Sequence, residues 1–152
     1  MGGISLASAR LEARGITFDR RWMLVDDTGM FLSQRKYPQL ALFKLAINQE
    51  SLQVTNKSTG NTIDIPFTPG GQSLQVQIWD DKVEAAEVSL SISTWFSSEL
   101  GVDVKLVFMP EETKRVVDQN YAHNSEVVSF ADGYPLLITN TASLNDLNKR
   151  LE

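Results

Sequence analysis

Apolar and polar residues alternate along much of this chain with the two-residue period of β-strands. The alternation is clearest in Ser73–Trp79, where one face carries Leu74, Val76 and Ile78. Two further β-prone runs, Trp22–Val25 and Met30–Gln34, flank Asp26-Asp27-Thr28-Gly29. This spacing predicts a hairpin in which Gly29 adopts a positive φ.

More apolar runs bounded by turn residues predict further strands. These runs are Leu40–Ile47, Ser51–Thr55, Thr62–Phe67, Val104–Phe108 and Pro135–Thr139. The last two runs are typical of buried strands. Because the strands follow one another in meander order, we expect a mainly β fold: a coiled, partly barrel-like antiparallel sheet.

Two segments instead carry apolar residues at helical spacing. From Ser91, the residues Ile92, Trp95, Phe96 and Leu100 recur every three or four positions, and Gly101 predicts the helix end. Near the C-terminus, Thr141 is a candidate cap for a second helix, whose apolar face holds Leu144, Leu147 and Leu151. The expected class is therefore α+β, with two short helices.

The composition indicates one globular domain over residues 1–152. Hydrophobic residues make up 42% and charged residues 22%, with a formal net charge of -5. The negative charge argues against nucleic acid as a partner, and no apolar run is long enough to span a membrane. Without a signal or transit peptide pattern, we expect a cytoplasmic protein.

The residue types limit the possible chemistry. The chain has no cysteine and one histidine, His123, which we interpret as a surface residue. Thiolate nucleophiles and zinc sites built from Cys and His are therefore excluded within this chain. The neighbouring carboxylates Asp80-Asp81 and Glu111-Glu112 do not face each other in a strand or helix, so we assign no catalytic residue and no metal ligand.

The densest basic and aromatic cluster runs from Arg14 to Trp22. Arg20, oriented by Asp19, could hold a phosphate or carboxylate through two hydrogen bonds. An ion pair between Asp19 and Arg20 that stabilises a turn explains the local pattern better. Arg35 could point to the same region or keep a strand end solvated, and the Lys114-Arg115 pair is typical of a solvated face.

The loop Ser129–Pro135 precedes a predicted buried strand and could approach a ligand closely. Gly133 would allow that approach, and Asp132 could orient an amide or a pterin-like ring nitrogen. A plain turn is the simpler explanation from local chemistry. The residues alone thus indicate a mostly β domain with an anion-binding patch and no identified ligand.

Taken in order, several segments resemble the N-terminal domain that precedes the MOSC domain in bacterial YcbX-type proteins and in amidoxime-reducing components. The matching segments are Gly15–Val25, Gly29–Arg35 with Pro38, Val76–Trp79, the Trp95-Phe96 helix, and Ser129–Ile138 running into Ala142–Asn148. The resemblance covers nearly the whole chain.

The resemblance implies a role in a molybdenum-cofactor oxidoreductase that reduces N-hydroxylated compounds. It implies that Arg20 contacts the phosphate end of the molybdopterin and that Asp132, Gly133 and Tyr134 lie along the cofactor cleft. Arg35 matches a basic position near that cleft, and Lys114-Arg115 match less closely. The implied partners are a downstream MOSC domain, expected beyond this chain, and a redox protein or domain that donates electrons.

Two departures from the family pattern matter. The family's opening Tyr-Pro-x-Lys-Ser stretch would lie just before Met1, and the cysteine that ligates molybdenum belongs to the MOSC domain. We therefore expect the chain alone to fold without catalysing a reaction. The alternatives are a stand-alone, non-catalytic binding module and an unrelated β-domain. The unrelated β-domain would require Asp19-Arg20 and Phe130–Pro135 to lie far apart in space.

Overall fold

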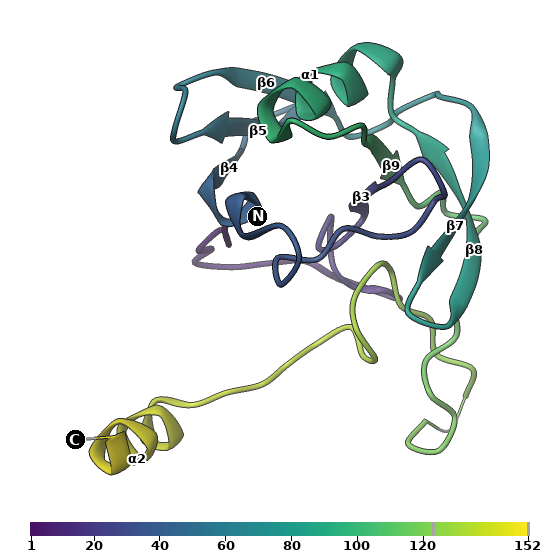
Figure 1. Ribbon diagram of the computed structural model, residues 1–152. Helices are drawn as coiled ribbons and strands as arrows, with labels where there is room; N and C mark the ends of the chain where they lie inside the picture. Colours follow the sequence, from purple (N-terminus) through teal and green to yellow (C-terminus); the bar gives the residue numbers. More distant parts are fainter. Residues whose placement is uncertain (123, 152) are drawn as a thin grey trace.

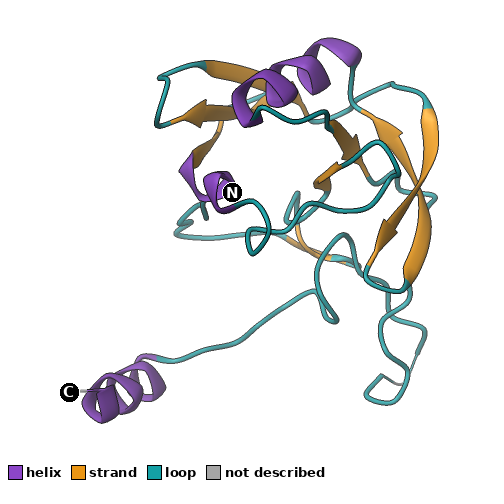
Figure 2. Cartoon of the chain, in the orientation of Figure 1, coloured by secondary structure: helices purple, strands orange, loops and turns teal. Residues whose placement is uncertain are grey.

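The computed structural model describes residues 1–122 and 124–151, and these form a mainly β protein (Figures 1 and 2). A four-stranded antiparallel sheet has the order β3 (Trp22–Val25), β9 (Lys105–Phe108), β8 (Asp81–Glu87), β7 (Ser73–Ile78). A three-stranded antiparallel sheet holds β4 (Phe43–Ile47), β5 (Ser51–Asn56) and β6 (Thr62–Pro66). The short strands β1 (Leu11–Glu12) and β2 (Gly15–Ile16) pair separately. The predicted mainly β fold with coiled antiparallel sheets and two helices is confirmed.

Strands β3 and β9 contribute to two hydrophobic clusters at once. In β3, Leu24 belongs to the cluster under the three-stranded sheet, whereas Met23 and Val25 belong to the cluster on the opposite face. In β9, Leu106 and Val107 divide in the same way. Because side chains alternate across a strand, this pair is buried on both faces and joins the two halves of the core.

Helix α1 (Leu90–Leu100) closes the first cluster, packing on β9 and β6. The Ser89 hydroxyl accepts a hydrogen bond from the Ile92 amide at 3.2 Å, which caps the N-terminus. Gly101 ends the helix in the left-handed region, with φ of 70°. The predicted helix and its glycine stop are confirmed, and its apolar stripe is the buried face.

The predicted hairpin after Val25 forms only in part. Gly29 has the expected positive φ of 83°, and the Asp26 carboxylate accepts bonds from the amides of Thr28 and Met30. The predicted strand Met30–Gln34 shortens to isolated bridges at Met30 and Phe31. The chain then turns at Ser33, whose carbonyl accepts from the amides of residues 36 and 37.

Two other segments differ from the predicted pattern. The start of the predicted strand Leu40–Ile47 belongs to a 3₁₀ helix, Pro38–Leu42, because proline at the first position favours a helical turn. Strand β8 was not predicted, since Asp81, Lys82, Glu84 and Glu87 occupy most of its positions and only Val83 and Ala85 are buried. Its partner strands β7 and β9 supply the apolar neighbours that stabilise it.

The prediction of a buried strand at Pro135–Thr139 is wrong. Leu137 and Ile138 are 89% and 91% exposed, and the segment forms no strand. Helix α2 (Thr141–Leu151) is present as predicted, but none of its residues is buried. Its cap is Asn140 rather than Thr141, since the Asn140 side chain accepts from the Ser143 amide at 2.8 Å. The tail and α2 extend away from the body (Figure 1).

Candidate functional site

A cavity of about 750 Å³ opens beside the start of β3. Its walls come from the N-terminal residues, the turn at residues 16–20, the segment 31–35 and the loop at 130–132. Arg20, Arg35 and Asp132 all line it. The structure therefore brings together three residues that lie far apart in the sequence.

The turn that carries Arg20 has an unusual backbone. Phe18, Arg20 and Trp79 have φ of 65°, 51° and 54°, in the left-handed region that disfavours residues other than glycine. All three line the same cavity. Left-handed residues of this kind persist only where the surroundings hold them, and they concentrate at functional sites. The backbone thus singles out this cavity independently of its charges.

Arg20 presents its guanidinium at the surface. Its Nη1 donates to Asp19 Oδ2 at 2.5 Å, and the two side chains are 57% and 39% exposed. The ion pair considered from the sequence therefore exists. The remaining guanidinium nitrogens have no hydrogen-bond partner among residues 1–122 and 124–151, so the pair leaves Arg20 able to bind an anion. The Phe130 amide donates to the Arg20 carbonyl at 3.0 Å and fixes the turn against the loop that carries Asp132.

Arg35 is the second cation of the cavity. It lies exposed in the turn that follows Ser33. Within the described part of the chain its side chain has no ion-pair partner. The structure has no strand at this position, so the interpretation that Arg35 keeps a strand end solvated does not apply. Arg20 and Arg35 thus both line the same cavity.

Arg115 holds the loop that carries the lining residues Phe130 and Asp132. Its buried guanidinium donates to the carbonyls of Ser129 and Asp132 at 3.0 and 2.9 Å and to that of Ala131 at 2.5 Å. Its Nε donates to Asp81 at 2.7 Å. The solvated face expected for Lys114-Arg115 holds for Lys114, which is exposed, and is wrong for Arg115, which is 6% exposed. Asp132 in turn accepts a bond from Trp79 Nε1 at 3.3 Å.

Gly133 and Tyr134, by contrast, lie outside the cavity lining. The Tyr134 hydroxyl donates to the Asp118 carbonyl at 3.2 Å. Desolvation raises the pKa of Tyr134, and the negative charge of Asp118 adds to the shift. A Cβ atom on Gly133 would meet nothing within 4 Å, so packing within this chain does not require a glycine there.

Two further buried arginines, Arg14 and Arg21, support the loop after β9. Arg21 Nη2 donates to the Met109 carbonyl at 2.6 Å, and its Nη1 pairs with Glu111 at 2.7 Å. Arg14 donates to the carbonyls of Glu111 and Thr113. Burial lowers the pKa of Arg14, and the positive charge of Arg21 lowers it further. The sequence places both arginines in the basic cluster Arg14–Trp22, but it does not indicate their burial, because their carbonyl partners lie 97 and 88 positions away.

Aromatic rings form a flat apolar part of the cavity wall. Phe18 stacks on Phe67 with ring centroids 4.2 Å apart, and Phe31 lies 4.7 Å from Trp79. Trp22, another lining residue, has a buried indole Nε1 without a hydrogen-bond partner. A ligand with a planar ring and an anionic group matches the aromatic side chains and the arginines of this cavity.

No group of three or more His, Cys, Asp or Glu side chains within residues 1–122 and 124–151 could hold a metal ion. No described helix is both long and apolar enough to cross a bilayer. His123, interpreted from the sequence as a surface residue, lies outside the described residues.

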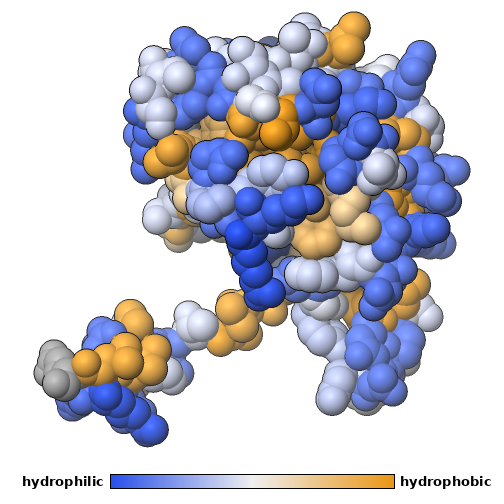
Figure 3. Space-filling model, in the orientation of Figure 1, coloured by the Kyte–Doolittle hydropathy of each residue, from blue (hydrophilic) through white to orange (hydrophobic). Residues whose placement is uncertain are grey.

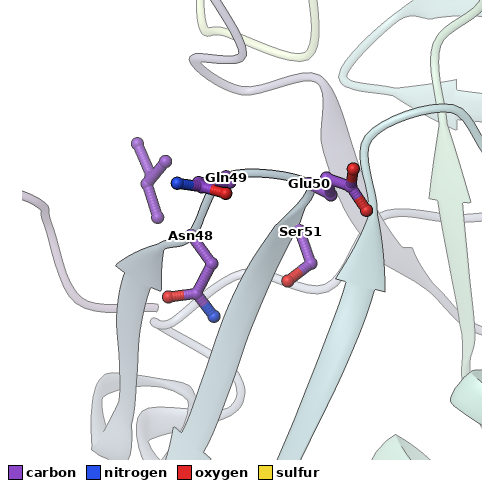
Figure 4. Close-up of a pocket in the computed structure, with 5 residues that line it drawn as sticks. Asn48, Gln49, Glu50 and Ser51 are labelled. Atoms are coloured by element: carbon purple, nitrogen blue, oxygen red, sulfur yellow. The ribbon is translucent and has the colours of Figure 1, made fainter.

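A second hollow, at the turn between β4 and β5, is a weaker candidate. It is lined by Ile47, Asn48, Gln49, Glu50 and Ser51 alone, so it belongs to a single turn (Figure 4). None of its five lining residues is cationic or aromatic. The cavity beside β3 is therefore the candidate site.

Comparisons with known proteins agree with the observed fold. The family model described as the MOSC N-terminal beta barrel domain matches residues 1–103. Mitochondrial amidoxime-reducing component 1 of Mus musculus is 28% identical over 99% of this chain and 47% of its own length. Molybdenum cofactor sulfurase of Bos taurus is 25% identical over 93% of this chain and 17% of its own length.

A solved structure supports the fold alone. The solution structure of a Bordetella bronchiseptica protein superposes with a TM-score of 0.52 and 18% identity, covering 70% of this chain and 91% of its own. The chain therefore spans about half of one curated relative and about one sixth of the other.

Proposed function

Because this chain belongs to the family of MOSC N-terminal β-barrel domains, we propose that it forms one wall of a molybdenum-cofactor site in a larger oxidoreductase. The observation that carries the proposal is the meeting of Arg20, Arg35 and Asp132 on one aromatic-lined cavity. The substrates proposed for the whole protein are N-hydroxylated compounds. They follow from the resemblance to amidoxime-reducing components.

The residues present fit the outer parts of such a cofactor. Two exposed arginine side chains suit a phosphate, and the aromatic wall suits a pterin ring. Asp132 can accept from an amino or ring N–H group. The chain offers no thiolate for molybdenum, and we assign that ligand to a following MOSC domain.

In this arrangement the chain binds and orients rather than reacts. When bound, the cofactor supplies two-electron redox chemistry at its metal. Arg20 and Arg35 neutralise the phosphate charge, and the aromatic residues keep water from one side of the ring. The bonds from Arg115 hold Asp132 at a fixed position. Electrons would come from a separate redox protein or domain.

The test is cofactor content in the protein that contains this chain together with its MOSC domain. Arg20→Ala should lower the molybdenum content per folded molecule about tenfold or more, since a charged hydrogen bond contributes about 1.5–3 kcal/mol. Its melting temperature should stay close to that of the wild type. Arg10→Ala is the matched control, because Arg10 is exposed and outside the cavity.

Asp19→Ala separates the two interpretations of Arg20. If Arg20 served only its ion pair with Asp19, both variants would lose stability equally and keep full molybdenum content. That result would contradict the proposed role of Arg20. A longer protein that holds no molybdenum when isolated intact would instead favour a non-catalytic binding role for this domain. The cytoplasmic localisation expected from the sequence stays a prediction. The name of one relative, the amidoxime-reducing component of Mus musculus, describes that relative as mitochondrial.

A further inference from the structure

The segment after Pro135 exposes apolar side chains that no other residue in the described part of the chain covers. Leu137 and Ile138 are 89% and 91% exposed. The leucines of α2, at 144, 147 and 151, are 55%, 53% and 76% exposed. Figure 3 shows these apolar patches on the extended tail and on one side of α2. Exposed apolar patches of this kind mark an interaction site.

The local structure indicates what kind of surface the segment needs. Leu144, Leu147 and Leu151 recur at three and four positions and so share one face of α2. An eleven-residue helix is too short to be stable alone in water, and the Asp146–Arg150 ion pair at 2.7 Å is exposed and contributes little. Leu136–Thr139 is extended and β-prone. The edge of a β-sheet could pair with Leu136–Thr139, and an apolar patch beside that edge could cover the leucine face of α2.

The point where the chain leaves the body is well defined. Gly15, with φ of 106°, lies so close to Pro135 that an added Cβ would approach the Pro135 Cβ to 2.9 Å. Pro135 is partly buried, whereas every residue described after it is exposed. The packing of this domain therefore ends at Pro135.

The comparisons indicate which partner covers the tail. The family model ends at residue 103, and the solved neighbour matches 70% of the chain. The amidoxime-reducing component matches 99% of the chain, so the tail is shared with a protein in which this chain occupies 47% of the length. A shared tail within a longer polypeptide favours the rest of that polypeptide as its partner over a second copy of this chain.

We infer that Leu136–Leu151 docks on the MOSC domain that follows in the same polypeptide. Leu136–Thr139 pairs with an open edge of a β-sheet there, and the leucine face of α2 covers the adjoining apolar surface. This inference rests on the proposed function in one respect, the presence of that domain. If the segment docks in this way, the N-terminal domain ends at Pro135 instead of at residue 152.

Hydrogen exchange tests the inference without any need for cofactor. Amides of residues 136–151 should exchange at least about 100-fold more slowly in the longer protein than in the 152-residue chain. In the longer protein, Ile138→Asp and Leu147→Asp should each abolish that protection and lower the melting temperature. Leu90→Asp is the matched control, because Leu90 is 78% exposed on α1 and should leave the tail protected.

Equal exchange rates in the two proteins would overturn the inference. So would a 152-residue chain that sediments as a dimer and returns to a monomer with Leu147→Asp, since the partner would then be a second copy. A protected tail in a protein without molybdenum would count against the proposed function alone. An unprotected tail in a molybdenum-loaded protein would count against the docking alone.

Discussion

At the scale of single residues, the backbone of Arg20 can be tested apart from its charge. Its φ of 51° costs an alanine about 1–2 kcal/mol and costs glycine nothing. Arg20→Gly should therefore be about 1 kcal/mol more stable than Arg20→Ala in urea unfolding. At Arg10, which has no positive φ, glycine should be no better than alanine. Equal stability of the two Arg20 variants would show that the turn relaxes.

Substitution of Arg115, in contrast, should lower the stability of the domain. Arg115→Gln would leave buried carbonyls of the loop at 129–132 without donors and should cost about 3 kcal/mol or more. Lys114→Gln, at the exposed neighbouring position, should change the free energy of unfolding by less than about 0.5 kcal/mol. Urea titration of both variants measures their free energies of unfolding. Similar values would show that the bonds from Arg115 do not stabilise the loop at 129–132.

The difference between these arginines also explains how far the site could be predicted. Arg20 and Asp132 were singled out by the resemblance to the MOSC N-terminal domain, since local chemistry alone favoured an ion pair for Arg20 and a plain turn for the loop of Asp132. The burial of Arg115 depends on Asp81 and on three carbonyls that the fold brings to it, so the sequence pattern resembled a solvated pair. Local sequence indicates which residues can bind, and tertiary contacts decide which of them are free to do so.

At the scale of elements, Glu99 links α1 to the turn between β5 and β6. Its carboxylate accepts bonds from Asn61, Asn56 and Thr59 at 2.6, 2.6 and 2.8 Å. The bond from Asn61 contributes most to lowering the pKa of Glu99 below its usual 4.5; burial opposes the shift, and the bonds from Thr59 and Asn56 reinforce it. Because the folded pKa is the lower one, the contribution of Glu99 is present above pH 4.5 and is lost as the pH falls through the folded pKa.

Glu99→Gln should therefore lower the free energy of unfolding by about 1 kcal/mol at pH 7, a value reduced by solvent screening. The difference from the wild type should shrink at pH 3. Urea unfolding at both values measures it. Glu50→Gln, on the exposed turn after β4, is the control and should have little effect at either pH. A difference that stays constant with pH would contradict the assigned role.

The elements themselves were predictable where one face is apolar and the partner is near in sequence. Helix α1 and strand β7 meet both conditions, and both were identified. Strand β8 was missed because its polar residues obscure the two-residue period of a strand. The buried strand at Pro135–Thr139 was wrongly expected, because none of the residues that the structure describes covers this apolar run. An apolar run predicts burial only where a partner exists to bury it.

At the scale of the whole molecule, we expect the pairing of β3 with β9 to form late in folding. Trp22 pairs with Phe108, so the edge strand β3 of the four-stranded sheet is joined to a strand about ninety residues later. Closing a loop of this length is slow, so β3 and β9 should pair later than strands that are neighbours in sequence. During synthesis β3 leaves the ribosome long before its partner and exposes an apolar strand meanwhile. A chain that stopped at residue 103, where the family model ends, would lack the strand that β3 and β8 share.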